Sequence, residues 1–178
     1  MERLRYEDVL TEDIPAVVGI ERESFTTADP DFEVECLDPG AWDEETVELV
    51  LREPRTRCLI VSNEEGVAVG WFCYELEGNG VLVRRLLVLP AWRKKDVGRT
   101  VLYKLYKLVS RSERRRTLRM YVPLTDVATC QYLAHMQFDS KLVRDGWDDG
   151  VDAVLFHFTA GENEDWPERA ARSDTEGE

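Results

Sequence analysis

The 178-residue sequence has no long apolar run. Its longest nearly apolar stretch, from Gly66 to Tyr74, is far shorter than the ~20 residues that a membrane span needs. The N-terminal residues, Met-Glu-Arg-Leu-Arg-Tyr-Glu-Asp, contain no apolar segment of the signal-peptide type. We therefore expect a soluble, cytoplasmic protein with no membrane partner.

Cysteine and histidine are scarce, with four and two residues respectively. No two cysteines stand at a Cys-x-x-Cys spacing, which leaves zinc and redox-motif interpretations with little support. Cys58 and Cys73 fall inside apolar, strand-like runs and are predicted to be small buried hydrophobes. His135 and His157 do not stand at a metal-ligand spacing. We expect no metal cofactor.

The overall composition is that of a globular protein, with 43% hydrophobic and 33% charged residues, 11 glycines and 7 prolines. It excludes a collagen-like, low-complexity or wholly disordered chain. The last 18 positions differ from the rest, because they are acidic and contain Trp166 as their only large apolar residue. We predict a single domain over residues 1–160 and a disordered acidic tail over 161–178.

Charge is unevenly distributed along a chain whose net charge is −13. Residues 1–83 hold 6 basic and 21 acidic side chains (net −15), whereas residues 84–119 hold 13 and 2 (net +11). An acidic protein is a poor general binder of nucleic acid, because phosphate neutralisation drives that binding. The basic block could face a small polyanion, an RNA or only solvent, and the acidic first half could attract a cationic substrate.

Hydrophobic periodicity and turn residues predict an α/β chain. Helices are expected to begin at Thr11, at Asp43, near Val97 and at Asp126, and the third should carry Val97, Val101, Leu105 and Leu108 along one face. The order of elements requires a mixed, mostly antiparallel central sheet of about seven strands flanked by about four helices. The predicted strands cover 3–10, 57–62, 67–76, 81–89, 118–122, 139–144 and 151–159.

The most informative stretch is a strand, a basic turn and a helix start between Val81 and Thr100. The N-terminus of a helix presents free N–H groups and the positive end of its dipole. Four cations surround that end, so the stretch is typical of a pyrophosphate site, with a solvated basic turn as the alternative. These cations are Arg93, Lys94, Lys95 and Arg99.

This stretch resembles motif A of the GNAT (Gcn5-related N-acetyltransferase) superfamily. In that motif a strand ending in Val-x-Pro runs into Arg/Gln-x-x-Gly-x-Gly/Ala. Here Val88-Leu-Pro90 precedes Arg93-Lys-Lys-Asp-Val-Gly98 at the same spacing. The resemblance extends over residues 5–160, and the segment with Phe25 and Trp42-Asp-Glu-Glu is similar to the bacterial ribosomal-protein N-terminal acetyltransferases.

The resemblance implies that acetyl-CoA is the co-substrate and that a primary amine is the acceptor. The strand backbone would pair with the pantetheine arm, as a ligand strand added to an exposed sheet edge, and the turn amides would take the phosphates. The acidic segment 29–48 lies where relatives hold the acceptor, so Glu33, Glu35 and Trp42 are the predicted substrate-binding residues. The predicted cofactor-binding residues are Leu86, Leu87, Val88, Arg93, Lys94, Lys95, Asp96, Val97, Gly98, Arg99 and Asp126.

The first motif glycine is replaced by Asp96. Aspartate is among the better non-glycine residues in the left-handed conformation, so the turn is expected to persist. Its carboxylate would oppose a pyrophosphate unless a neighbouring cation screens it, and we expect weakened rather than abolished CoA binding.

The later helix departs further from the family. Counting back from Phe138, the usual Asn is Asp126, which keeps the capping role, and the Gly is Gln137. The usual Tyr acid is Leu133, which cannot donate a proton. Two catalytic candidates remain. Tyr132 is turned by about 100° from position 133 on a helix, and Tyr121 stands where some relatives keep a glutamate base.

Two functions from different classes follow. One is an acetyltransferase that works mainly by positioning, with a cationic amine of a small molecule or protein as the acceptor. The other is a GNAT-fold protein that binds acyl-CoA or a protein partner with weak catalysis or none. An RNA- or ribosome-binding module that uses residues 84–119 is a third, less favoured reading, and a homodimer is compatible with the sequence.

Overall fold

The computed structural model describes residues 3–26, 40–112, 114, 116–146 and 150–160. The side chains of residues 25 and 26 are not described either. Predictions that concern the acidic residues Glu33 and Glu35, the Phe25 side chain and the tail at 161–178 therefore lie outside the described residues.

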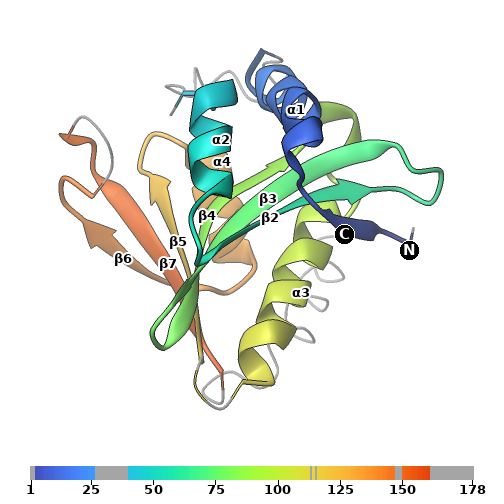
Figure 1. The fold of residues 1–178 in the computed structure, drawn as a ribbon. Coiled ribbons are helices and arrows are strands. Elements are labelled where there is room, and N and C mark those ends of the chain that lie inside the picture. Colours follow the sequence, from blue (N-terminus) through green and yellow to red (C-terminus); the bar gives the residue numbers. More distant parts are fainter. Residues whose placement is uncertain (1–2, 27–39, 113, 115, 147–149, 161–178) are drawn as a thin grey trace, which may run out of the picture. The chain divides into compact units, whose positions relative to one another are not determined.

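The described residues form an α/β fold with a seven-stranded mixed sheet and four α-helices, as predicted (Figure 1). The strands follow the order β1-β2-β3-β4-β5-β7-β6. The strands are β1 (Arg5–Asp8), β2 (Thr56–Ser62), β3 (Ala68–Glu77), β4 (Gly80–Val88), β5 (Thr117–Pro123), β6 (Asp139–Val143) and β7 (Ala153–Thr159). The helices are α1 (Ile14–Thr26), α2 (Glu44–Leu51), α3 (Val97–Ser110) and α4 (Val127–His135).

The chain divides into two compact units. The first contains β1, α1, α2, β2, nearly all of β3, residues 83–88 of β4 and the start of α3. The second contains the end of α3 together with β5, α4, β6 and β7.

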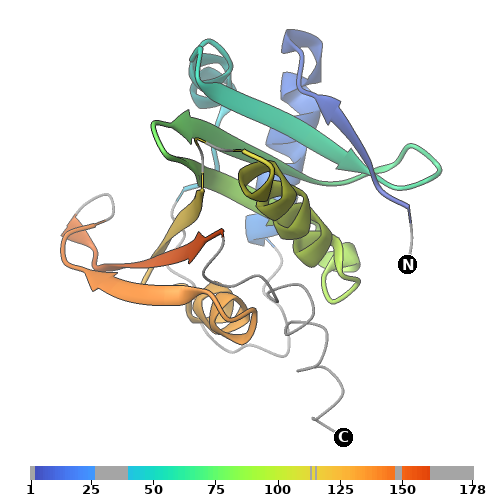
Figure 2. The same ribbon diagram turned by 90° about the horizontal axis from the view of Figure 1, so that it is seen from below.

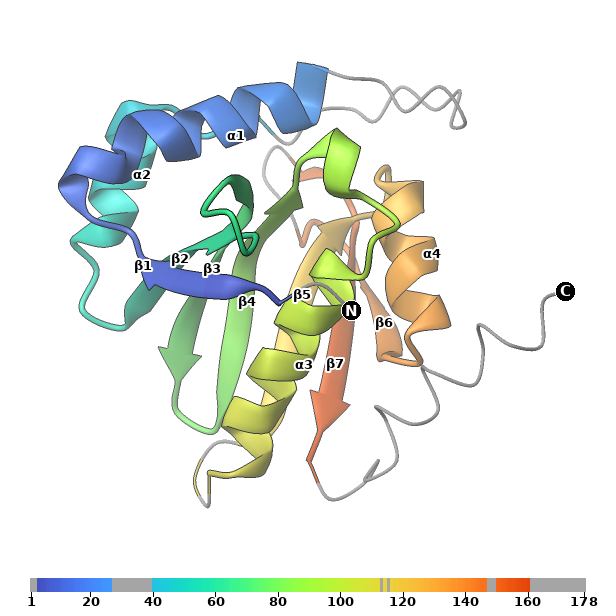
Figure 3. The same cartoon turned by 90° about the vertical axis from the view of Figure 1, so that its right-hand side faces the viewer.

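In the first unit, β1, β2 and β3 form an antiparallel ladder, in which Tyr6 lies opposite Val61 (Figure 3). Both α1 and α2 pack on one face of this ladder. Val17 of α1, Val47 of α2 and Trp71 of β3 belong to one apolar core cluster, and all three side chains are at most 1% exposed. Burial of such side chains is the main favourable term in folding.

Two of the predicted helix caps are present. The Asp43 carboxylate accepts a hydrogen bond from the Thr46 N–H at 2.8 Å, and the Asp126 carboxylate accepts one from the Thr129 N–H at 3.0 Å. Each cap satisfies an N–H group that has no partner within its helix. The first helix starts differently, because Thr11 opens a 3₁₀ turn that precedes α1.

Leu108, expected along one face of α3 with Val97, Val101 and Leu105, is 41% exposed, whereas those three residues are at most 3% exposed. The buried stripe of α3 is centred near Leu105 and continues to Val109. Successive residues of a helix are turned by about 100°, so Leu108 lies about 60° from Leu105 on the same side as Val97 and Val101, and its angular position does not explain its exposure.

In the second unit, β7 pairs antiparallel with both β5 and β6. Phe156 of β7 lies opposite Met120 of β5 and Ser140 of β6. Figure 2 shows β6 and β7 running side by side with α4 next to them. Leu133 of α4 and Phe158 of β7 are each 1% exposed and belong to the core.

The end of α4 places a non-glycine residue in a conformation that favours glycine. Gln137 has φ 60°, its N–H donates to the Ala134 carbonyl at 2.9 Å, and the Phe138 N–H donates to the Leu133 carbonyl at 3.2 Å. This pair of hydrogen bonds is the Schellman arrangement, which usually carries glycine at the left-handed position.

We predict that Gln137→Gly raises the free energy of unfolding by about 1 kcal/mol, because a left-handed residue with a Cβ costs about that much. Urea denaturation would measure the change. The matched control is Gln131→Gly, at an exposed position inside α4, which should lower stability by about 1 kcal/mol. Equal losses in both variants would contradict the prediction.

Candidate functional site

The end of β4 lies against β3 at a point where only a glycine fits. A Cβ added to Gly70 would lie 2.4 Å from the Leu87 carbonyl oxygen, and the Leu89 N–H donates to the Val69 carbonyl at 2.9 Å. Leu86, Leu87 and Val88, where the pantetheine arm is predicted to pair, are half-buried. The backbone position of this strand end is therefore set by contact with β3.

The turn after β4 contains two residues in the left-handed conformation. A 3₁₀ turn over Pro90–Trp92 leads into two residues with positive φ, Lys94 and Asp96, both at 59°. Asp96 thus takes the left-handed conformation expected at the motif glycine. Its carbonyl accepts hydrogen bonds from the N–H and the hydroxyl of Thr100 at 2.9 and 2.8 Å, so that α3 begins directly after it.

The Asp96 carboxylate has a cationic neighbour. The Arg99 guanidinium lies 3.5 Å from it, one turn along α3. Lys94 and Lys95 are exposed at the same turn, and the Lys95 ammonium lies 4.5 Å from the centre of the Trp92 ring. Arg99 therefore partly neutralises the negative charge of Asp96 at the place where the phosphates are expected.

The Arg93 side chain is held by two backbone carbonyl groups. Its guanidinium donates to the Val88 carbonyl at 3.2 Å and to the Ser24 carbonyl at 2.9 Å. Ser24 lies in the last turn of α1, where carbonyl groups lack partners within the helix. Arg93 therefore joins the end of β4 to the end of α1.

A buried ion pair connects β4 to α1, and its two residues are not among the predicted site residues. Glu21 of α1 is fully buried, and its carboxylate pairs with the guanidinium of Arg85, at 3.0 Å from Nε and 2.5 Å from a terminal nitrogen. The same carboxylate accepts the indole N–H of Trp71 and the backbone N–H of Trp42, both at 2.9 Å. Arg85 also donates to the Gly40 carbonyl at 2.8 Å.

Two patterns in the sequence could have identified this pair. Glu21 follows Ile14, Val17 and Val18 at positions i+7, i+4 and i+3, which places it on the apolar face of the helix. Arg85 follows Val81 and Val83 at alternate positions of β4, and all three side chains are on the buried face of the strand. A charged side chain on a buried face is costly unless a side chain of opposite charge pairs with it.

Trp42, a predicted substrate-binding residue, is half-buried within this cluster. The centre of its ring lies 5.6 Å from that of Trp71, in an edge-to-face arrangement. The guanidinium carbons of Arg85 and Arg84 lie 5.2 and 5.9 Å from its ring. The ring is thus already engaged with two cations of the protein.

The remaining candidates lie in the second unit. Tyr121 is half-buried on β5, opposite Leu155. Tyr132 of α4 is 38% exposed, whereas its neighbour Leu133 is 1% exposed, so the two side chains face different surroundings, as predicted. Asp126 caps α4 as described above.

Within the described part of the chain, no three His, Cys, Asp or Glu side chains are grouped as a metal ion would require. Among the same residues, no helix is both long and apolar enough to cross a membrane.

Comparisons with known proteins agree with this architecture. No curated protein matches the chain. The fold is similar to that of the ribosomal-protein-S18-alanine N-acetyltransferase from Escherichia coli (TM-score 0.67, 18% identity, 90% of this chain and 98% of that one). It is also similar to Arabidopsis thaliana NAA60, solved in complex with a bisubstrate analogue (TM-score 0.68, 12% identity, 89% and 99%).

A third similar structure is a spermidine N-acetyltransferase chimera from Vibrio cholerae and hSSAT (TM-score 0.66, 10% identity, 93% of this chain and 97% of that one). At these identities the likeness concerns the fold. The family model for acetyltransferases of the GNAT type matches residues 16–136, which is more than half of the sequence and includes β4, the basic turn and α3. The chain therefore belongs to the acetyltransferase (GNAT) family.

Proposed function

We propose that this protein is a cytoplasmic N-acetyltransferase that moves an acetyl group from acetyl-CoA to a primary amine of a small molecule or a protein. The observation that carries the proposal is the turn at Asp96. It has the left-handed backbone of the motif glycine, it leads directly into α3, and Arg99 offsets its charge. A helix N-terminus with cations around it is a binding site for phosphate groups.

The residues present fit acetyl-CoA. The backbone of the half-buried residues Leu86 to Val88 would pair with the pantetheine arm, and the amides from Asp96 to Gly98 would take the pyrophosphate. Lys94, Lys95 and Arg99 would add charge-assisted contacts. Arg93 would act through the backbone that it holds rather than through a phosphate. Asp126 would contribute from the start of α4.

The thioester supplies an activated acetyl group, and the protein must hold the amine against it and accept one proton. Holding two reactants in contact can supply about 7–11 kcal/mol of the barrier. The usual proton donor is replaced by the buried Leu133, and loss of a general acid costs about 10²–10⁴ in rate. Tyr121 and Tyr132 remain weak candidates for the proton transfer. We therefore propose slow turnover.

We further propose that the acceptor is cationic. The described part of the acidic segment presents Asp43, Glu44 and Glu45 as exposed side chains at the start of α2. Acidic groups around a site raise the local concentration of a cationic substrate. The Trp42 ring already contacts two guanidinium groups. We therefore propose that the carboxylates, and not the Trp42 ring, attract the cationic acceptor.

The second candidate function is a protein of this fold that binds acyl-CoA or a protein partner with little or no catalysis. The burial of Leu133 at the position of the usual acid favours it. An assay of acetyl transfer across a panel of amines separates the two, because only the enzyme consumes acetyl-CoA.

Calorimetric titration with acetyl-CoA tests the site. Asp96→Gly should tighten binding several-fold, because it removes an anion and a left-handed residue with a Cβ.

Arg99→Glu should weaken acetyl-CoA binding about tenfold, since charge-assisted contacts to phosphate are strong. The matched control is Arg55→Glu, the same charge reversal at an exposed position before β2. Pantetheine, which lacks the phosphates, should bind all forms equally. A wild type that binds neither acetyl-CoA nor CoA would overturn the proposal.

A further inference from the structure

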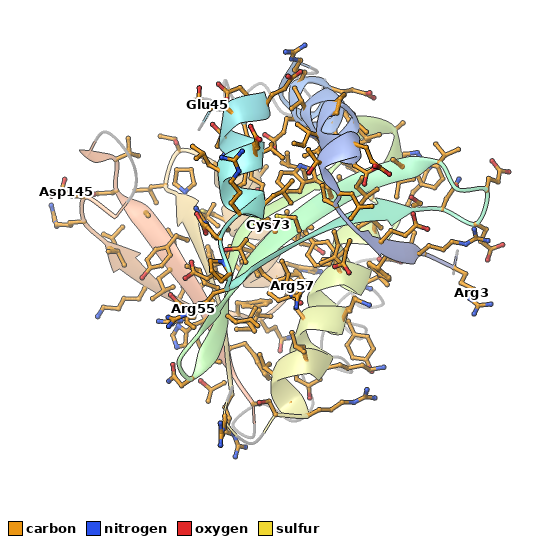
Figure 4. The ribbon with its side chains drawn as sticks, in the orientation of Figure 1. Arg3, Glu45, Arg55, Arg57, Cys73 and Asp145 are labelled. Carbon is orange, nitrogen blue, oxygen red and sulfur yellow. The ribbon has the colours of Figure 1, made fainter. Side chains whose placement is uncertain are left out.

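Two free cysteines that are distant in the sequence lie directly opposite each other in the first unit. Cys58 of β2 is paired in register with Cys73 of β3. The two side chains are 5% and 0% exposed, in the apolar cluster beneath α1 and α2. Figure 4 labels Cys73 on the strands near α2. Burial was predicted for both residues, but their pairing was not.

The ladder shows which kind of pair this is. The Leu76 N–H donates to the Arg55 carbonyl at 2.9 Å, so these two opposite residues are a hydrogen-bonded pair. Hydrogen-bonded and non-hydrogen-bonded pairs alternate along antiparallel strands, and three steps lead from this pair to Cys58 and Cys73. The Cys58 carbonyl instead accepts the Val9 N–H of the preceding segment, on the other side of β2. The two cysteines are therefore a non-hydrogen-bonded pair.

Such a pair has the separation that a disulfide needs. Opposite Cα atoms in non-hydrogen-bonded pairs are about 4.5 Å apart, and disulfides span about 4.4–6.8 Å between Cα atoms. A bond between the two sulfurs would break no ladder hydrogen bond, because neither residue donates or accepts across this pair. The strands can thus stay in place when the bond forms.

The surroundings favour a reactive thiolate at one of the two positions. A hydrogen bond with the Cys73 thiol lowers the pKa of Cys58, and the nearby Arg84 guanidinium lowers it further, against the effects of burial and of the Glu53 carboxylate. The same hydrogen bond, together with burial, raises the pKa of Cys73. Arg84 is held in this region by its ion pair with Glu53. A thiolate is the form of cysteine that oxidants attack.

We propose that Cys58 and Cys73 are a cross-strand dithiol that hydrogen peroxide oxidises to an intramolecular disulfide. The Cys58 sulfur attacks the peroxide oxygen, the O–O bond breaks, and a sulfenic acid forms with release of water. The Cys73 sulfur then attacks the sulfenic sulfur, and the S–S bond forms as a second water leaves. Two thiols lose two electrons and two protons in total, and the peroxide is reduced. Because both residues are buried, the first step requires local opening of the unit and is slow.

The test uses the full chain with Cys36→Ser and Cys130→Ser, in which only Cys58 and Cys73 keep a thiol. The protein is treated with hydrogen peroxide, unfolded, alkylated and mapped by mass spectrometry without reduction. We expect a cross-linked peptide pair that contains both residues. The Tm should rise by roughly 5–10 °C and return after dithiothreitol, because the bond closes a loop of about 15 residues.

The matched control adds Cys73→Ser to the same background, and it should show neither the cross-link nor the rise in Tm. Full alkylation of both thiols after peroxide would overturn the proposal. So would conversion of Cys58 to a sulfinic acid without a disulfide. If the serine background fails to fold, the wild type is mapped instead. A link between Cys58 and Cys73 is then the expected result, and links of either residue only to Cys36 or Cys130 would contradict it. None of these readouts depends on acetyl transfer.

Discussion

Replacement of Glu21 by glutamine will lower the free energy of unfolding by about 3–5 kcal/mol, the usual cost of breaking a buried ion pair. The Arg85 side chain is only 7% exposed, so its charge would be left in the core without its counter-ion. Glutamine has nearly the same shape as glutamate, but one of its two acceptor oxygens becomes an NH₂ group. That group would face the Arg85 guanidinium or the backbone N–H of Trp42, both of which are donors.

The measurement is urea denaturation followed by tryptophan fluorescence and circular dichroism. The matched control is Glu48→Gln, the same chemical change in the exposed ion pair with Arg52 on α2. Exposed pairs of this kind contribute about 0.3–0.5 kcal/mol, so the control should remain close to wild type. Similar losses in the two variants would contradict a special role for Glu21. The double change Glu21→Leu with Arg85→Met should recover much of the loss, because it removes both charges together.

Gly70→Ala is expected to impair both stability and acetyl-CoA binding. The new Cβ would lie 2.4 Å from the Leu87 carbonyl oxygen and 3.3 Å from the Val88 Cα, so that backbone atoms of β4 must move. Overpacking of a core costs about 1–3 kcal/mol, and the rigid backbone at this contact favours the upper end. The displaced segment is the one proposed to pair with the pantetheine arm, and we expect at least a tenfold weaker acetyl-CoA complex at a temperature where the variant is folded.

The matched control is Gly19→Ala, on the exposed side of α1, where a Cβ would meet nothing within 4 Å. It should raise stability by about 0.5–1 kcal/mol, because glycine inside a helix is unfavourable, and leave acetyl-CoA binding unchanged. Calorimetry and thermal denaturation of both variants supply the two readouts. Normal acetyl-CoA affinity in folded Gly70→Ala would show that the strand end does not hold the ligand.

Most of the secondary structure could be predicted from local pattern. The predicted strand at 118–122 is β5 over Thr117–Pro123, and the helix expected near Val97 begins at that residue. Asp43 and Asp126 cap helices as expected, because a capping carboxylate acts on an N–H only three residues away. Leu108 is exposed although it follows the same periodicity, because periodicity places a residue on a helix face but does not show which part of that face is covered.

The candidate site could be predicted only in part. The motif spacing located the turn, and the known tolerance of aspartate for positive φ was enough to expect its shape at Asp96. The hydrogen bonds of Arg93 to Val88 and Ser24 could not be inferred, since Ser24 is 69 positions away in the chain. A cation beside a phosphate motif looks the same in sequence whether it binds the ligand or holds the backbone.

By itself the sequence determined the family resemblance, the order of helices and strands, and the position of the basic turn at Asp96. Each of these depends on residues within a few positions of one another. Only the tertiary structure decided that Glu21 meets Arg85 and that Cys58 faces Cys73. The first contact requires α1 to pack over β3 and β4. The second requires the register of β2 and β3, which shifts at Val61 and Ser62 beside the turn. A shift of one residue would turn every side chain of a strand to the other face, so such pairings follow from the assembled sheet and not from its separate strands.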